Sequence, residues 1–457
     1  MFKGVKMGTR EMNMCEGGIF SKIIKFSIPL MLSGILQLLF NAADIVVVGN
    51  FSGPESLAAV GSTSALINLI INLFIGVSIG ASVLMGKYIG ARDYKNANDT
   101  VHCAMFIALF GGVILSFVGL LFAKPLLIMM DTPSDVINLS TIYMVIYFVG
   151  MPGFMIYNFG SALLRAIGDT KTPLYYLFFA GIFNVILNLI LVIVFSMGVQ
   201  GVAIATVVSQ YISGGLILLL LIKSDDVLHL NIKKMKIHKD KLKEMLRVGL
   251  PAGLQGMIFS ISNVLIQSSV NSFGSLAMAG NTAASNIESF IYTSMNAVYQ
   301  TALSFTSQNM GAKTYKRIDK ILIECLIFVT IIGIVMGVGA YMIGDKLLLI
   351  YTNDMNVVNY GLMRMSIISK MYFICGLMDV MCGSLRGMGY AILPMVVSLI
   401  GVCLLRIVWI YTIFKVDHSL VTLYISYPIS WFVTALVHML GYLYVRRKVL
   451  KVDYALQ

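Results

Sequence analysis

Long apolar runs separated by short polar segments follow one another along the chain from about residue 20 to residue 445. Most runs hold roughly 20 residues, the length that an α-helix needs to cross the ~30 Å hydrocarbon core of a bilayer. The strict alternation of apolar and polar residues that is typical of a membrane-spanning barrel is missing. The pattern predicts an all-α integral membrane protein with twelve transmembrane helices, at residues 20–48, 58–84, 99–122, 136–161, 173–195, 201–222, 246–270, 278–305, 321–343, 357–383, 391–413 and 420–444.

Composition supports this fold class. Hydrophobic residues make up 58% of the 457-residue chain and charged residues 12%, whereas soluble proteins are nearer half apolar and a quarter charged. The N-terminal segment MFKGVKMGTREMNMCEGG contains no apolar stretch with a small-residue cleavage site, so we expect the first hydrophobic helix to act as its own insertion signal.

Motifs of catalysis and metal binding are missing as well. The chain holds no HExxH or GxSxG motif, no paired membrane aspartates and no Walker motif, so we expect neither an enzyme nor direct use of ATP. The cysteines are scattered and none has zinc-like spacing with a histidine. We therefore expect no catalytic residues, no metal and no cofactor, with these cysteines acting as small apolar residues: Cys15, Cys103, Cys325, Cys375, Cys382 and Cys403.

Basic residues lie mostly on one side of the predicted membrane. Of the 33 Lys and Arg residues, only three fall in loops opposite the termini and three within helices, respectively Lys124, Lys346, Lys415 and Arg364, Lys370, Arg406. Because basic loops remain cytoplasmic, the pattern predicts cytoplasmic termini and a cytoplasmic (inner) membrane location. The net charge of +12, including the basic stretch KKMKIHKDKLKEMLR, is then an orientation signal. A nucleic-acid or regulatory role for this stretch is the alternative.

The chain contains the same motifs twice, in the same order. The offsets between the copies are 222, 221 and 221 residues, for IPLMLSG (28–34) and LPAGLQG (250–256), GARDYK (90–95) and GAKTYK (311–316), and LRAIGDTKTP (164–173) and LRGMGYAILP (385–394). Three matches in register indicate duplication. Six helices per repeat give parallel repeats, as in transporters whose two lobes enclose a central site. The expected organisation is an N-terminal segment (1–19), an N-lobe (20–222), a basic linker (223–245), a C-lobe (246–445) and a C-terminal tail (446–457).

The stretch FNAADIVVVG, the LAAVG that follows it, the GARDYK and GAKTYK turns and the repeated LRxxG…P together resemble the multidrug and toxic compound extrusion (MATE) transporters. The resemblance covers about residues 20–445. It implies two six-helix lobes in a V shape and efflux of organic, often cationic, compounds driven by proton or sodium entry.

An acidic residue, Asp44, interrupts the apolar run of the first helix. Ionisable residues at membrane depth are rare and mark functional sites by default. Asn41 precedes Asp44 by three residues on the same helix face, and we expect Asn184 and Asn188, spaced i,i+4, to face it from the fifth helix. Desolvation disfavours the ionised carboxylate, so Asp44 would take up a proton from an acidic exterior. The alternatives are an acid simply tolerated at the interface, and asparagines that only bond helices together.

The resemblance bears on these residues. Family members carry an acid at the position of Asp44, which implies ion coupling there. Some proton-coupled relatives have a second aspartate where this chain has Asn188, so a two-aspartate proton site is not implied.

The second half holds charges of both signs at membrane depth: Glu288, Lys370, Asp379 and Arg406. Because a lone charge in the membrane is costly, we expect internal pairing in which Lys370 neutralises Glu288 or Asp379, leaving a structural or gating role. Some relatives bind sodium with acids in this lobe. A nearby lysine disfavours a cation, so protons are preferred and sodium is the alternative. Arg386 is expected instead as a loop anchor on the cytoplasmic side.

Amides and tyrosines suit loose recognition of flat, amphiphilic molecules, because aromatic faces attract cations. Each of them could equally serve helix packing. The predicted substrate-cavity residues are Gln37, Asn68, Tyr157, Gln255, Asn263, Gln267, Tyr292, Asn296 and Tyr299.

These features together predict a monomeric secondary antiporter. It would export small amphiphilic, cationic organic compounds in exchange for protons by alternating access, with membrane lipid and no nucleic acid as its other partner. The alternatives are sodium-coupled drug efflux by the same fold, and a flippase for lipids or lipid-linked saccharides of the same superfamily.

Overall fold

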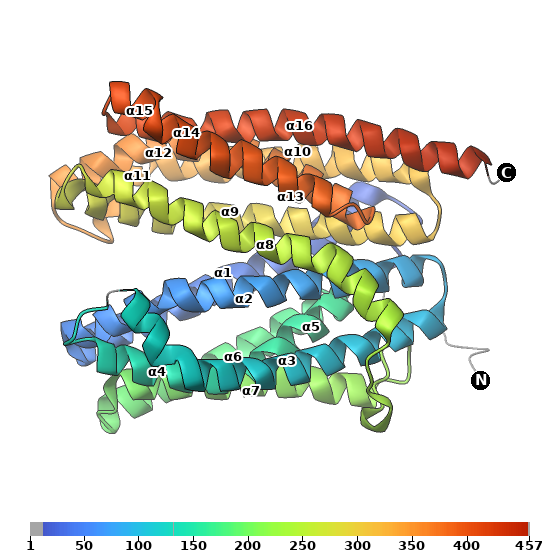
Figure 1. Cartoon of the computed structure of the whole chain (residues 1–457), viewed down its shortest axis with the longest axis horizontal. Coiled ribbons are helices and arrows are strands. Elements are labelled where there is room, and N and C mark those ends of the chain that lie inside the picture. Colours follow the sequence, from blue (N-terminus) through green and yellow to red (C-terminus); the bar gives the residue numbers. More distant parts are fainter. Residues whose placement is uncertain (1–11, 131, 456–457) are drawn as a thin grey trace. The chain divides into compact units, whose positions relative to one another are not determined.

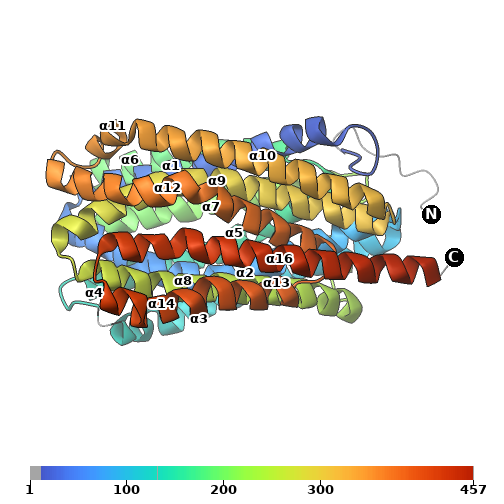
Figure 2. The same cartoon turned by 90° about the horizontal axis from the view of Figure 1, so that it is seen from above.

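The computed structural model describes residues 12–130 and 132–455, and the regular elements of this part of the chain are all helices (Figures 1 and 2). Ten helices are long and apolar enough to span a membrane, and an eleventh span is formed by α4 (Ile137–Val149) and α5 (Met151–Ile167), which meet at a 49° bend. The twelfth expected span corresponds to α9 (Ser275–Gly311), a long helix with more polar residues than the other spans. The all-helical fold class is confirmed.

The chain forms two compact units. The first contains Leu32–Gly253 together with the segment that ends at Asn13, and the second contains Met14–Met31 and the chain from Leu254 onward. The two helix breaks, at positions 31/32 and 253/254, lie 222 residues apart, the offset of the first pair of motifs. The units therefore differ from the expected lobes at the beginnings of two long helices, α1 (Ile19–Phe51) and α8 (Lys239–Asn271), because each of these parts belongs to the other unit.

Prolines precede both breaks. Pro29 lies inside α1 and Pro251 inside α8, two residues before the break in each helix. Proline removes a backbone hydrogen bond and its ring clashes with the preceding turn, so a long helix can change direction there. The repeated proline therefore accounts for the point at which each helix passes from one unit to the other.

The first unit is built around α5, which packs against three neighbouring helices. Its elements are the second part of α1, α2 (Gly53–Gly90), α3 (Tyr94–Met129), α4, α5, α6 (Lys171–Leu189), the π-helical turn η1 (Ile190–Val194), α7 (Gly198–Lys223), the 3₁₀ turn η2 (Ile232–Lys234) and the first part of α8.

The second unit is built around α12 (Met355–Gly387), which packs against α9, α10 and α16. Its other elements are the first part of α1, the second part of α8, α9, α10 (Tyr315–Met342), α11 (Gly344–Leu349), α13 (Ile392–Ser398), the π-helical turn η3 (Leu399–Leu404), α14 (Leu405–Tyr411), α15 (Ile413–Val416) and α16 (Leu420–Ala455).

The expected terminal segments are described only in part, because residues 1–11 and 456–457 lie outside the described residues. Arg317 holds the N-terminal segment of the second unit through three backbone carbonyls. Its Nε donates to Met14 O at 3.2 Å, and its Nη2 donates to Glu16 O at 2.9 Å and Gly17 O at 2.8 Å. This segment is therefore a docked part of the second unit.

Two pairs of glycines bring α2 and the first part of α8 into backbone contact within the first unit. Gly76 and Gly80 on α2 face Gly249 and Gly253 on α8, and each pair has the i,i+4 spacing that permits close helix crossings in membranes. A Cβ on Gly76 would lie 2.2 Å from Gly253 N, and one on Gly80 would lie 2.1 Å from Met245 O. Only glycine fits at these positions.

We expect Gly76→Leu to destabilise the protein by about 1–3 kcal/mol, because the larger side chain forces two packed backbones apart. The measurement is the thermal unfolding midpoint of the detergent-solubilised chain. Gly61→Leu is the matched control, because a Cβ on Gly61 in the same helix meets nothing within 4 Å. Equal losses in the two variants would contradict this account of the crossing.

Candidate functional site

Asp44 lies in the second part of α1 and accepts hydrogen bonds from two other helices. Asn188 Nδ2 of α6 donates to its Oδ1, and Thr206 Oγ1 of α7 donates to its Oδ2 at 3.2 Å. Asn188 Nδ2 also lies 3.5 Å from Asn184 Oδ1, and these asparagines are only 1% and 4% exposed. The structure therefore brings together the acid and the i,i+4 asparagine pair that the sequence singled out.

A cavity of about 140 Å³ opens beside this carboxylate within the first unit. Asp44 is the one charged residue among those that line it, and the remainder are amides, hydroxyls, aromatic rings and small apolar residues. The lining consists of Gln37, Phe40, Asn41, Asp44, Tyr143, Tyr147, Phe154, Tyr157, Leu177, Ala180, Gly181, Asn184, Thr206, Ser209, Gln210 and Ser213. Of the predicted site residues, Gln37, Asn41, Tyr157 and Asn184 are in this set.

Two buried amide oxygens beside the cavity have no hydrogen-bond partner in the described chain, Asn188 Oδ1 and Gln210 Oε1. Buried polar atoms are normally satisfied, so each is an available acceptor for a donor on a bound molecule or for water. The π-helical turn η1 begins two residues after Asn188, at Ile190. Such turns occur frequently at functional sites because they re-aim neighbouring side chains.

Several residues of this site were not predicted. Thr206 donates directly to Asp44, and Tyr143, Tyr147 and Gln210 line the cavity. A signal was present in α7, where Thr206, Ser209 and Ser213 follow at spacings of three and four and therefore share one face. Serine and threonine in membrane helices more often bond to their own backbone, so this stripe alone does not indicate a site.

The second unit contains a buried ion pair between Glu288 of α9 and Arg364 of α12. Arg364 Nη2 lies 2.7 Å and Nε 3.1 Å from Glu288 Oε2, and the two residues are 6% and 2% exposed, respectively. Arg364 Nη1 also donates to Asn281 Oδ1 at 2.7 Å, while Ser369 Oγ donates to Glu288 Oε1 at 3.3 Å. Both charges are therefore compensated inside the unit.

The expected pairing of Lys370 with Glu288 is wrong, because Arg364 is the partner of Glu288. Lys370 follows Arg364 by six residues, which puts it on a different face of α12. Its Nζ lies 3.8 Å from the centre of the Tyr341 ring, a cation–π contact. No ion pair joins Lys370 to Asp379 in the described part of the chain either, and Asp379 is half-buried.

Arg406 is 3% exposed and is held by one hydroxyl and two aromatic rings. Its Nε donates to Ser430 Oγ at 2.8 Å, and its guanidinium carbon lies 4.0 Å from the Tyr427 ring centre and 5.6 Å from that of Trp431. The faces of aromatic rings carry negative potential and stabilise a buried cation.

Arg386 lies inside the unit, in the last turn of α12, and is 5% exposed. The expectation of a cytoplasmic loop anchor is therefore wrong. Its Nη1 donates to Tyr299 Oη at 2.6 Å and its Nη2 donates to Gln255 Oε1 at 2.7 Å. Two predicted cavity residues thus bind an arginine of the helix bundle.

The other predicted cavity residues are dispersed. Gln267 accepts from Asn281 Nδ2 at 2.9 Å and donates to Asn271. Tyr292 is 39% exposed and Asn296 half-buried. Asn263 of α8 and Asn68 of α2 are exposed.

The described residues contain no group of three or more His, Cys, Asp and Glu side chains that could hold a metal ion. The ionisable groups of the interior are thus arranged as hydrogen-bonded or ion-paired side chains.

The MatE family model matches residues 29–190 and again residues 251–412, so the two matched stretches begin 222 residues apart. Among curated proteins, the chain is 28% identical to the probable multidrug resistance protein YpnP of Bacillus subtilis, over 86% of this chain and 87% of YpnP. It is 24% identical to the probable multidrug resistance protein NorM of Thermotoga maritima, over 85% and 84% of the two chains.

Solved structures agree with the fold. A MATE protein crystallised in complex with MaL6 superposes with a TM-score of 0.91 at 22% identity, covering 97% of this chain and all of that one. An outward-facing multidrug resistance MATE transporter of the MOP superfamily gives a TM-score of 0.90 at 21% identity, covering 97% and 99%. MATE transporters need no cofactor. Because the family model matches well over half of its residues, this chain belongs to the MATE family of multi-pass membrane transporters, which are not enzymes.

Proposed function

We propose that this protein exports amphiphilic, cationic organic compounds in exchange for protons, by alternating access, with Asp44 as the coupling acid. One observation carries the proposal. Asp44 is the only charged residue lining a cavity that otherwise offers amides, hydroxyls and aromatic rings, and no basic side chain lines that cavity to neutralise it. The relatives named as multidrug resistance proteins support drugs as the substrate class.

A carboxylate of this kind can serve a proton and an organic cation in turn. When Asp44 is protonated, the cavity is neutral and a cation gains little from it. When Asp44 is ionised, Asn188 and Thr206 stabilise the negative charge by hydrogen bonding, and the cavity attracts a cation. The aromatic rings that line the cavity add cation–π attraction. The two ligands thus compete for one charge, which is the requirement for exchange.

The size of the cavity suggests how exchange is coupled to a change of conformation. At about 140 Å³, it is smaller than the ~300 Å³ or more of sites for drug-sized ligands. A drug would therefore need the helices around Asp44 to move apart before it could enter. The proton, which needs no such space, could be held in the state described.

The second unit is assigned a structural role. Glu288 is matched by Arg364, so this pair adds no net negative charge that would attract sodium. The remaining candidate for a cation in this unit is Asp379, which leaves sodium coupling as the alternative. We further propose cytoplasmic termini, a cytoplasmic-membrane location and a monomer.

Purified protein in lipid vesicles tests the proposal. Ethidium movement would be followed by fluorescence under a proton gradient alone and, separately, under a sodium gradient alone. We expect the proton gradient to drive ethidium accumulation and the sodium gradient to have no effect. Accumulation under sodium alone would overturn proton coupling, and no accumulation under either gradient would overturn the proposed exchange.

A further inference from the structure

The segment between α7 and α8 is a packed part of the first unit. Val227, Leu228 and Leu230 are 3%, 2% and 1% exposed and belong to the hydrophobic core of that unit. The Leu230 N–H donates to Leu221 O at 2.9 Å. Three buried apolar residues in a loop of this length fix its path against the helices.

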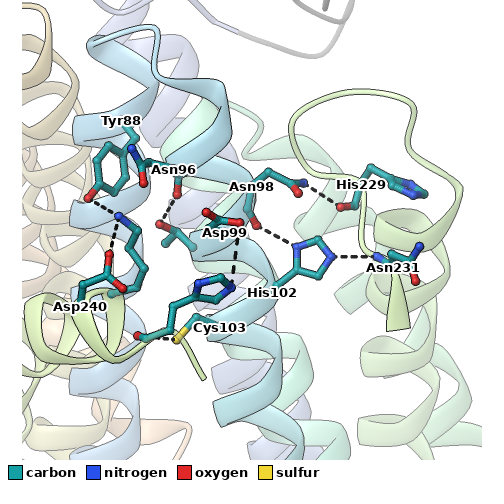
Figure 3. A network of polar contacts seen from close by, with 12 residues as sticks. Tyr88, Asn96, Asn98, Asp99, His102, Cys103, His229, Asn231 and Asp240 are labelled. Atoms are coloured by element: carbon teal, nitrogen blue, oxygen red, sulfur yellow. Dashed lines mark hydrogen bonds and ion pairs between the residues drawn. The ribbon is translucent and has the colours of Figure 1, made fainter. Parts of the chain in front are cut away.

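Side chains of α3 fasten the same segment (Figure 3). Asn98 Nδ2 donates to Val227 O at 2.9 Å and to His229 O at 2.8 Å. The Asn231 N–H donates to His102 Nε2 at 3.1 Å, while His102 Nδ1 lies 2.9 Å from Asn98 O. A ring nitrogen facing a carbonyl must carry the hydrogen, so His102 is the neutral tautomer that leaves Nε2 free to accept.

The part that follows this fastening exposes both apolar and basic side chains. Ile232 is 58% exposed and Ile237 46% exposed. Four exposed lysines surround them, and residues 231–239 contain no acid: Lys233, Lys234, Lys236 and Lys239. None of these lysines forms an ion pair with a described residue, in contrast to Lys241 of the same region, which contacts Asp240 and Tyr88. We call residues 231–239 the basic hook.

The attachment to α3 puts the basic hook near the edge of the apolar part of that helix. The first large apolar side chain that α3 exposes is Leu109, followed by the 49% exposed Phe110. His102 precedes Leu109 by seven residues, or about 10 Å along the helix axis. The headgroup layer on each side of the hydrocarbon core is roughly 5–8 Å thick. The hook therefore lies at about the depth of lipid headgroups.

We propose that the basic hook binds the anionic phospholipid headgroups of the adjacent membrane leaflet. The lysines contact the headgroup phosphates, and Ile232 and Ile237 enter the apolar boundary beneath them. Charge complementarity selects this partner, because basic clusters beside a membrane span are attracted to anionic lipid and exposed apolar side chains add burial there. His102 and Asn98 are positioning residues, since they fix the hook to α3 without contacting lipid themselves.

A fluorophore on the hook tests the proposal in the full-length chain. Ile237→Cys, in a Cys15→Ser background, would carry an environment-sensitive dye; the five other cysteines are buried. The chain would be placed in vesicles of phosphatidylcholine alone or of phosphatidylcholine with phosphatidylglycerol. We expect emission about twofold stronger with phosphatidylglycerol, quenching by brominated acyl chains, and loss of the difference at high salt.

A matched pair of variants separates the hook from general charge effects. Lys233→Gln/Lys234→Gln/Lys236→Gln should remove most of the response to phosphatidylglycerol. Lys313→Gln/Lys316→Gln/Lys320→Gln removes the same number of exposed lysines between α9 and α10, and should leave the response unchanged. Equal emission in both lipids, no quenching by brominated chains, or equal losses in both triple variants would overturn the proposal.

The test does not depend on the proposed transport reaction. It uses no gradient and no substrate, and both leaflets of the vesicles have the same composition, so the orientation of the chain does not matter. A failed dye response with intact ethidium transport would overturn the lipid site alone.

Discussion

Asp44→Asn should abolish proton-driven accumulation of ethidium while the protein still inserts and folds. The substitution keeps the size and hydrogen-bonding capacity of the side chain but removes the only charge lining the cavity. Asn188 and Thr206 can still donate to the new amide oxygen, so the packing of α1, α6 and α7 should be retained. A side chain that cannot ionise can neither release a proton nor attract a cation in its place.

The expected size of this effect follows from the gradient. One pH unit supplies about 1.4 kcal/mol per proton, which supports about tenfold accumulation at one-to-one exchange. The Asp44→Asn variant should instead equilibrate ethidium to a ratio of about one under the same gradient, the value at which no driving force is transmitted. The measurement is the steady-state dye ratio in vesicles with a fixed pH difference.

Two further variants locate the coupling group. Asp379→Asn removes the half-buried acid of the second unit and should leave proton-driven accumulation intact. Thr206→Val removes one donor to Asp44 but keeps the acid, so transport should be slower without loss of the final ratio. If Asp379→Asn abolished accumulation and Asp44→Asn did not, the coupling acid would belong to the second unit.

The helices were predictable because membrane spans depend on one-dimensional properties. Length and apolarity along the chain are enough to place twelve spans, and ten of the helices in the structure meet both criteria unaided. The exchange of helix beginnings between the units was not predictable. It depends on which surfaces fit, such as the α2–α8 crossing at Gly76 and Gly249, and on helix directions after Pro29 and Pro251.

The contacts of Asp44 were partly predictable for a similar reason. Asn184 and Asn188 share a helix face through their spacing alone, and a lone acid needs donors, so their meeting followed from local rules. Thr206 comes from a helix whose rotation about its axis is set by tertiary packing. Sequence spacing fixes which residues share a face, but it does not fix which neighbour that face meets.

The choice of Lys370 over Arg364 as the partner of Glu288 shows the same limit. Both bases lie in α12, and helix geometry alone assigns them to different faces without saying which face meets α9. Chemistry favours arginine, because its planar guanidinium offers several donors and is less strongly hydrated than a lysine ammonium. The three hydrogen bonds that Arg364 makes to Glu288 and Asn281 use that capacity.

Breaking the Glu288–Arg364 pair should be the most destabilising change in the second unit. Glu288→Gln leaves a buried guanidinium without its counter-ion, and Arg364→Met leaves a buried carboxylate without its own. Removing one partner of a buried pair typically costs about 3–5 kcal/mol, because the remaining charge keeps its desolvation penalty and loses its compensation. We expect both single variants to unfold at clearly lower temperatures in detergent.

The double variant separates a structural pair from a functional one. Glu288→Gln/Arg364→Met removes both charges, so it should recover much of the stability lost in either single variant, with a coupling free energy of about 0.5–3 kcal/mol in the double-mutant cycle. Glu55→Gln, which changes an exposed acid in α2, is the control and should be neutral. If the pair is structural, the recovered double variant should also retain proton-driven accumulation of ethidium. A stable double variant without transport would instead assign the pair a part in the transport cycle, because its charges would then be needed for something other than holding α9 against α12.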